Sequence, residues 1–179
     1  MRLRKANAII SLITTALLLD HAIYYSIWML SRGTISRPVE ISPFILVGLI
    51  ALHAVQSIAM AILGHKGAEK VPVKGYTKLN LPTVLQRATG IVMLILIAVH
   101  IAGASNYFQP KALHAVVHPL FFAVVLTHTS ISVIKALITL GIGSKKVLKC
   151  IGIVLLILCG TIMIASCIGF QMCLFMGVG

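Results

Sequence analysis

Acidic residues are almost absent from this chain. Its 179 residues include only 3 Asp or Glu against 15 Lys or Arg, and charged side chains make up 10% of the sequence. A water-soluble domain carries about a quarter charged residues. This deficit of charge excludes a soluble globular protein.

Five long stretches carry the apolar residues, which make up 59% of the chain. Asp20 is the only charge in residues 6–31, and residues 41–65, 88–110, 112–134 and 150–179 contain no Asp, Glu, Lys or Arg. A helix needs about 20 mostly apolar residues to cross a bilayer. We therefore predict a single all-α integral membrane domain, and the length excludes a sizeable extramembrane catalytic domain. The five transmembrane helices are expected at about residues 6–30, 44–63, 83–105, 115–140 and 147–175.

The connectors between these stretches are short and contain Gly and Pro, including Pro43 and Pro82. Short connectors favour antiparallel neighbours in an up-and-down bundle. The first four helices are expected to form such a bundle, with the fifth as an extra helix.

The cations lie mostly on one side of the expected membrane. A net charge of +12 would suggest a nucleic-acid partner for a soluble protein. Here twelve cations fall on one side and three on the other, which is the positive-inside pattern of a membrane protein. The N-terminus is therefore expected in the cytoplasm and the C-terminus outside, with no nucleic-acid partner. The three cations on the outer side are Arg32, Arg37 and Lys111.

Histidines provide the strongest functional signal. Four of the seven lie well inside apolar stretches, one on each of the first four helices: His21, His53, His100 and His128. Ionisable residues at membrane depth usually mark function. A single histidine could equally be hydrogen-bonded at a helix interface, but four on consecutive helices favour a shared site.

The depths of these histidines divide them into two pairs. At 1.5 Å per residue, His21 and His100 lie about 14 Å and about 8 Å from the outer ends of their helices. By the same rise, His53 and His128 lie about 15 Å and about 18 Å from the inner ends. The members of each pair are on diagonal helices of an up-and-down bundle. Two opposed imidazoles at one depth suit axial ligation of a planar macrocycle, which predicts two b-type haems.

Two other roles for the histidines, a zinc site and a proton relay, fit this sequence less well. Zinc requires three or four protein ligands at one level, whereas these pairs are staggered. A proton relay usually includes carboxylates, and Asp20 is the only one inside a helix.

Polar residues near the helix ends are candidates for binding haem propionates. Lys135 follows His128 by two helical turns on roughly the same face, although a lysine there could simply snorkel to the interface. Gly90 could let a flat ring approach the backbone, or could serve helix packing. His114 and His118 are either interfacial or line an entry site, and His65 is expected in a loop. The other propionate candidates are Gln86, Arg87 and Asn7 inside and Arg32 and Arg37 outside.

Two segments resemble a known family. The run LPTVLQRATGIVMLILIAVH at residues 81–100 resembles a helix-opening signature in the membrane anchors of succinate dehydrogenases and fumarate reductases. The run FAVVLTHTSISVIKALITLG at residues 122–141 is similar to their later helix, where a basic residue follows a haem-ligating histidine by seven positions. The whole chain resembles their five-helix, single-chain, two-haem cytochrome b anchor. The resemblance assigns His21 and His100 to the distal haem and His53 and His128 to the proximal haem, in agreement with the depths.

This resemblance implies a complex with two soluble subunits, a flavoprotein carrying FAD and an iron-sulfur protein. The chain would pass electrons between the iron-sulfur subunit and menaquinone or ubiquinone in a prokaryotic cytoplasmic membrane, with no dicarboxylate active site of its own. Glu40 is the candidate for an acidic residue beside the quinone, and is equally well a solvated loop charge. Leu126 stands where some members have a glutamate proposed to conduct protons, so that route is not expected here.

Two alternatives remain open at this point. One is the cytochrome b anchor of another quinone-linked oxidoreductase, such as a hydrogenase or formate dehydrogenase. The other is a haem-free anchor or small transporter in which the histidines are relay or packing groups.

Overall fold

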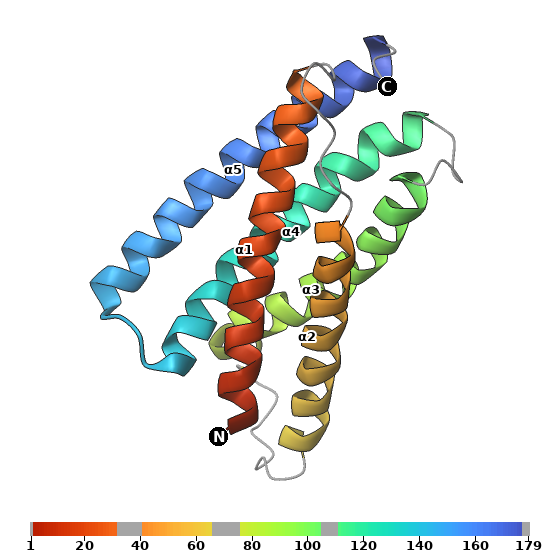
Figure 1. The fold of residues 1–179 in the computed structure, drawn as a ribbon. Helices are drawn as coiled ribbons and strands as arrows, with labels where there is room; N and C mark the ends of the chain where they lie inside the picture. The colour runs from red at the N-terminus through yellow and green to blue at the C-terminus, as the bar shows by residue number, and fades with distance from the viewer. Residues whose placement is uncertain (1, 32–40, 66–75, 105–110, 177–179) are drawn as a thin grey trace.

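The computed structural model describes residues 2–31, 41–65, 76–104 and 111–176. These residues form five α-helices and no strand (Figure 1). The helices are α1 (Arg2–Leu30), α2 (Ile41–His65), α3 (Tyr76–Ala104), α4 (Lys111–Leu140) and α5 (Lys145–Met176).

All five helices are long and apolar enough to cross a membrane. Large apolar side chains cover their outer faces, as at Phe44 on α2 and Ile91 on α3, which are 76% and 64% exposed. Such surfaces need lipid rather than water around them. The prediction of an all-α chain with five helices long and apolar enough to span a membrane is confirmed for the described residues.

The helices begin earlier than predicted at two prolines. Pro43 and Pro82 were placed in connectors, but they lie within α2 and α3. Pro43 is in the first turn of its helix, where a missing N–H costs no hydrogen bond. Pro82 is exposed and lies in the second turn of α3, so only one backbone bond close to the helix end is lost.

Consecutive helices run in opposite directions, so that α1 begins where α4 ends and α5 begins (Figure 1). Exposed cations gather at this end of the molecule, which we call the basic end. They are Arg4, Lys5, Lys145, Lys146 and Lys149.

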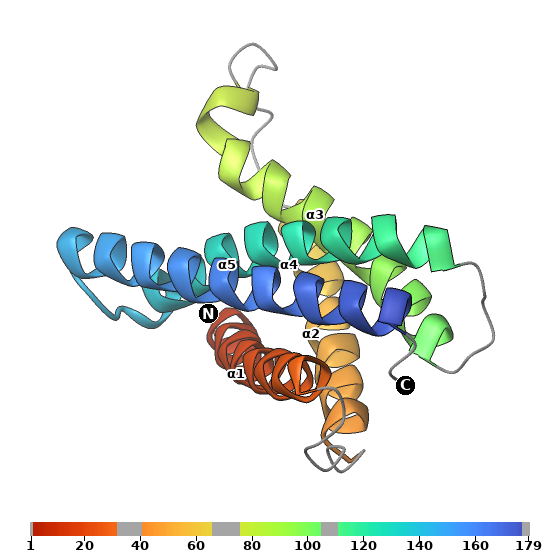
Figure 2. The same ribbon diagram turned by 90° about the horizontal axis from the view of Figure 1, so that it is seen from above.

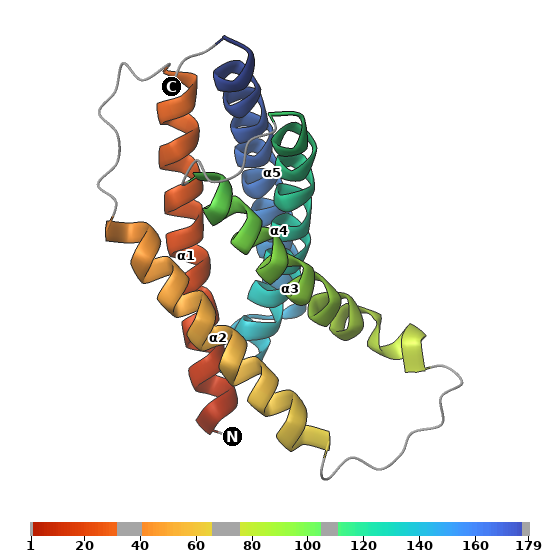
Figure 3. The same cartoon turned by 90° about the vertical axis from the view of Figure 1, so that its right-hand side faces the viewer.

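Helix contacts differ from those of a closed bundle. Helix α1 packs against α2, α4 and α5, and α4 packs against α1, α3 and α5. Figure 2 shows α5 alongside α4, with α3 splaying away on the other side. Within the described residues, α2 and α3 do not pack against each other, and Figure 3 shows them diverging toward the basic end. The expectation that all consecutive helices are contacting neighbours is therefore wrong for this pair, because a cavity lies between them.

Small residues bring α1 and α5 close together. The hydroxyls of Ser26 and Ser166 form a hydrogen bond between the two helices, and Ser166 is fully buried. Nearby, Gly169 lies against Met29 and Leu30 of α1. Small residues at such interfaces let helix backbones approach closely in a membrane.

The variant Gly169→Leu is expected to destabilise the protein by about 1–3 kcal/mol, as overpacked cores do. A Cβ at this position would lie 3.0 Å from the Met29 Cβ and 3.5 Å from the Leu30 backbone nitrogen, so α1 and α5 must separate. Thermal unfolding in detergent measures the change. The control is Gly160→Leu on the same helix, where a Cβ meets no atom within 4 Å. Equal melting temperatures for the two variants would contradict the close approach.

Candidate functional site

A cavity of about 530 Å³ lies between α1, α2, α3 and α4. Its volume is within the range of about 300–1,000 Å³ that is usual for small-molecule and cofactor sites. Each of the four helices contributes one histidine to its wall: His21, His53, His100 and His128. The four histidines singled out in the sequence therefore share one site.

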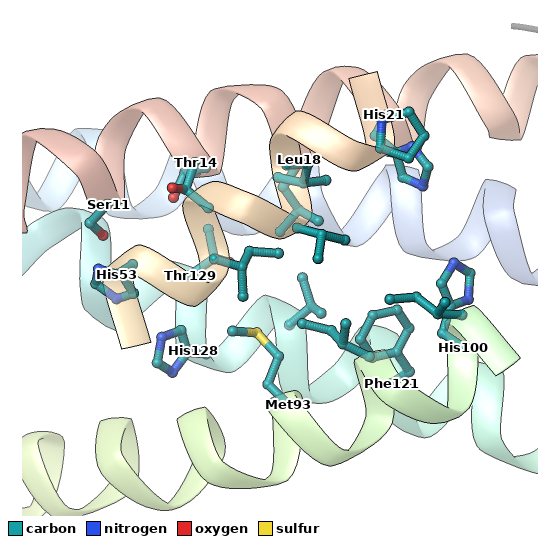
Figure 4. Close-up of a pocket in the computed structure, with 18 of the residues that line it drawn as sticks. Ser11, Thr14, Leu18, His21, His53, Met93, His100, Phe121, His128 and Thr129 are labelled. Atoms are coloured by element: carbon teal, nitrogen blue, oxygen red, sulfur yellow. The ribbon is translucent and has the colours of Figure 1, made fainter. Parts of the chain in front are cut away.

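The histidines lie at two ends of this cavity (Figure 4). His53 and His128 are together at the end nearer the basic end, and His21 and His100 are at the other. Each pair comes from two helices that do not pack against each other, α2 with α4 and α1 with α3. The imidazoles thus approach one another across the cavity rather than across a helix contact.

Helix α3 holds the His128 ring in a defined orientation. The Nδ1 atom of His128 lies 3.1 Å from the backbone carbonyl oxygen of Gln86 and 3.2 Å from the Thr89 hydroxyl. Because a carbonyl can only accept, Nδ1 carries the proton and donates it. The Nε2 atom then keeps its lone pair, which is the arrangement that prepares a histidine to bind a metal.

Gly90 gives this ring the space that it occupies. A Cβ at Gly90 would lie 3.1 Å from the Cε1 atom of His128 and 3.5 Å from its Nδ1 atom. The sequence suggested that Gly90 either lets a flat ring approach the backbone or serves helix packing. In the structure its missing side chain makes room for the imidazole itself.

His21 and His53 carry ring nitrogens that have no partner. The Nδ1 atoms of both are buried and make no hydrogen bond within the part of the chain that the structure describes, and the His21 ring packs on Tyr25 at a centroid distance of 4.5 Å. Buried polar atoms in proteins are nearly always paired. These two rings are therefore able to accept further contacts from a bound group.

The remaining ligand candidate, His100, belongs to an aromatic cluster. Its ring stacks on Phe121 at 5.3 Å and lies 5.6 Å from the ring of His118. His118 in turn stacks on Phe170 of α5 at 4.0 Å and is 8% exposed. The expectation that His118 is interfacial or lines an entry site is wrong, because it is buried behind His100 and does not line the cavity. Its i,i+4 spacing to Phe122, whose ring it also meets, is the only sequence signal for this cluster.

Of the inner propionate candidates, none lines the cavity. The Lys135 ammonium donates a 2.8 Å hydrogen bond to the Thr83 hydroxyl, which ties α4 to α3. The Gln86 amide donates at 2.9 Å to Ser132, a residue of the cavity wall. Arg87 is exposed, and Asn7 donates to Ser57 at 3.5 Å. These polar groups surround the cavity at the basic end without entering it.

Several sequence-predicted residues lie outside the described part of the chain or have side chains that the structure does not describe. They are Arg32, Arg37, Glu40, His65, Lys111 and His114.

The described residues contain no group of three or more His, Cys, Asp or Glu side chains placed to hold a metal ion. A protein-bound zinc needs such a group, whereas a haem iron with two axial histidines needs only two protein ligands.

Comparisons with known proteins do not identify a family for this chain. No protein-family model matches it, and no curated protein or solved structure gives a significant match. The functional argument therefore rests on the residues of the cavity.

Proposed function

We propose that this chain is a membrane cytochrome that binds two b-type haems and carries electrons across part of the bilayer. The observation that supports this most is the placement of four histidines, from four helices, as two opposed pairs at the ends of one cavity. His53 and His128 would hold the haem nearer the basic end, and His21 and His100 the other.

The protein's own groups would orient the ligands and exclude water. The Gln86 carbonyl accepts a hydrogen bond from the His128 Nδ1–H, which leaves the Nε2 lone pair available for a metal. Phe121 restricts the His100 ring by stacking on it. Each bound haem would supply a one-electron carrier, and two in series span more of the membrane than one.

The two ends of the cavity differ in polarity, which would separate the two haem potentials. Ser11, Thr14 and Ser132 line the end with His53 and His128, whereas Phe44 and Phe121 line the end with His100. Ligand environment, hydrogen bonding and burial tune haem potentials.

The biological partner is proposed from the resemblance to succinate dehydrogenase and fumarate reductase anchors. In that function an iron-sulfur subunit, bound in turn to a flavoprotein with FAD, docks at the basic end. Menaquinone or ubiquinone exchanges electrons near the His21 and His100 end. The exposed cations of the basic end support a cytoplasmic orientation for that surface, because cytoplasmic loops of membrane proteins are rich in Lys and Arg.

The haem content of the purified chain tests this function. We expect about two b-type haems per chain from a pyridine haemochrome assay, together with a dithionite-reduced minus oxidised difference spectrum typical of b cytochromes. The matched control replaces all four cavity histidines by alanine and should bind none. A wild-type chain without haem, when produced with excess haem available, would overturn the proposal and favour a haem-free anchor. Purification of the haem-loaded chain with a hydrogenase or formate dehydrogenase would keep the cytochrome and change its partner.

A further inference from the structure

Polar side chains form a continuous file on one face of α1, from its start to the middle of the membrane. Asn7, Ser11 and Thr14 follow one another at helical spacing, and Ser11 and Thr14 line the cavity. Ser11 is 7% exposed and Thr14 is 8% exposed, so neither faces the lipid. Ser57 of α2 faces this file and accepts a hydrogen bond from Asn7.

Several polar atoms in and beside this file have no hydrogen-bond partner. The Oδ1 atom of Asn7, the Oγ1 atom of Thr14, the Oε1 atom of Gln56 and the Nδ1 atom of His53 are all buried and unpaired. Gln56 is one helical turn from His53 on α2. An unpaired buried polar group destabilises the folded protein, and water cannot reach such groups from surrounding lipid.

The hydrogen-bonding chemistry of these atoms determines which groups can pair with them. The amide oxygens of Asn7 and Gln56 only accept hydrogen bonds, so they require a donor. Carboxylate groups such as haem propionates are acceptors when ionised and cannot serve them. Water can donate to these oxygens and accept from other groups at once, and buried waters typically make two to four such bonds.

The cavity beyond Thr14 is different in character. Leu18 follows Thr14 on the α1 face, and Ile97 and Val125 line the wall from α3 and α4. These side chains have no group that could hold a water molecule. A polar region that starts at the basic end therefore stops about halfway along the cavity.

We propose that this polar file is a hydrated path through which water and protons reach the half of the cavity at His53 from the basic end only. Asn7 and Ser57 form its entrance, beside the exposed Arg4 and Lys5, and Ser11 and Thr14 form its wall. Protons exchanged there when the charge inside the cavity changes would then come from one side of the membrane. The path follows from polar atoms of the chain and does not depend on haem being the bound group.

Cysteine accessibility tests the path in the full-length chain. Ser11→Cys and Thr14→Cys are placed in a background in which the four native cysteines are replaced by alanine. The chain is inserted into sealed vesicles of known orientation, and a membrane-impermeant, negatively charged methanethiosulfonate reagent is added to one side. Only the thiolate, which forms only where water is present, attacks this reagent and displaces its methanesulfinate group.

We expect both path variants to react at least about 10-fold faster than two controls, because thiolate formation requires hydration. One control is Ile13→Cys, at the same depth on the lipid-facing side of α1, where Ile13 is 48% exposed. The other is Val125→Cys, in the apolar part of the cavity wall. Reaction of the path variants should occur from the basic end alone.

The path is wrong if either path variant reacts no faster than Ile13→Cys, or if both react equally from the two sides. Ser11→Cys changes a single atom, so its folding is the least perturbed of the set. Haem absorbance recorded on the same samples separates this result from the cytochrome proposal, since a haem-loaded chain with unreactive cysteines would overturn only the path.

Discussion

Replacement of His128 by alanine is expected to lower the haem content from two per chain to one. The variant would remove one of the two histidines proposed to hold the haem at the end of the cavity near the basic end. His53→Ala should remove the same haem, because His53 faces His128 across the cavity (Figure 4). His21→Ala and His100→Ala should each remove the other haem. Pyridine haemochrome assays and redox titrations, which resolve the two haems by potential, measure the outcome.

Double variants test the pairing itself. His53→Ala with His128→Ala should lose no more haem than either alone, whereas His53→Ala with His100→Ala should lose both haems. His118→Ala is the matched control, because His118 is a buried histidine on α4 that stacks on Phe170 outside the cavity wall. It should retain two haems. Two haems in every single variant, or additive loss within one pair, would show that the histidines do not act as paired ligands.

The sequence alone was sufficient to predict the helices and the relative depths of the histidines. Charge-free runs of about 20 residues or more have few outcomes other than a transmembrane helix. The rise of 1.5 Å per residue then converts sequence position into depth, once the direction of each helix is known. The placement of His53 and His128 at one end of the cavity, and His21 and His100 at the other, follows from these two rules.

The lateral contacts could not be predicted in the same way. Short connectors limit how far apart helices can start, but side-chain shape decides which faces meet along their length. The length of the connector between α2 and α3 therefore does not predict that these two helices fail to pack against each other. The cavity that separates them includes bulky side chains from both, such as Phe44 and Met93, which line it without interlocking.

The hydrogen-bond partners of polar side chains also could not be predicted from the sequence. Lys135 and Gln86 were predicted near haem propionates from their positions on the helices. In the structure they bind hydroxyl groups on a neighbouring helix, Thr83 and Ser132. Helical periodicity predicts which face of a helix carries a residue, but not the hydrogen-bond partner of its side chain. In the membrane, a nearby hydroxyl group competes with other acceptors for each donor. Every residue has a backbone carbonyl, so the one that orients His128 cannot be predicted from residue type.

Two haems bound at the two ends of one cavity would have surroundings of different polarity, and would therefore differ in how protons compensate a change in their charge. The end at His53 is lined by hydroxyl groups and is reached by the proposed hydrated path, while aromatic rings lie at the end with His100. A polar, hydrated surrounding stabilises charge that an apolar one does not. Changes of charge would then be compensated by protons mainly at the basic end of the molecule.

Gly90→Leu is expected to remove the haem at the basic end while leaving the other in place. A Cβ added at this position would lie 3.1 Å from the His128 Cε1 atom, closer than the optimal distance of about 3.5–4.0 Å between two carbon atoms. The larger leucine side chain must push the imidazole out of its place against α3. The ring then loses the hydrogen bond from its Nδ1 atom to the Gln86 carbonyl, and with it the contact that fixes its orientation and tautomer.

Haem content and the redox titration of Gly90→Leu measure this effect, and Gly90→Ala should give a weaker one with partial occupancy. The control is Gly48→Leu on α2, where a Cβ meets nothing within 4 Å. Both leucine variants gain the same intrinsic helix propensity of about 1 kcal/mol over glycine, so a general effect on helix formation would appear in both. Full retention of both haems in Gly90→Leu, with unchanged potentials, would show that the position of His128 against α3 is not needed for binding. Loss of only the haem at the basic end would instead link a single missing side chain on α3 to ligation by a histidine on α4.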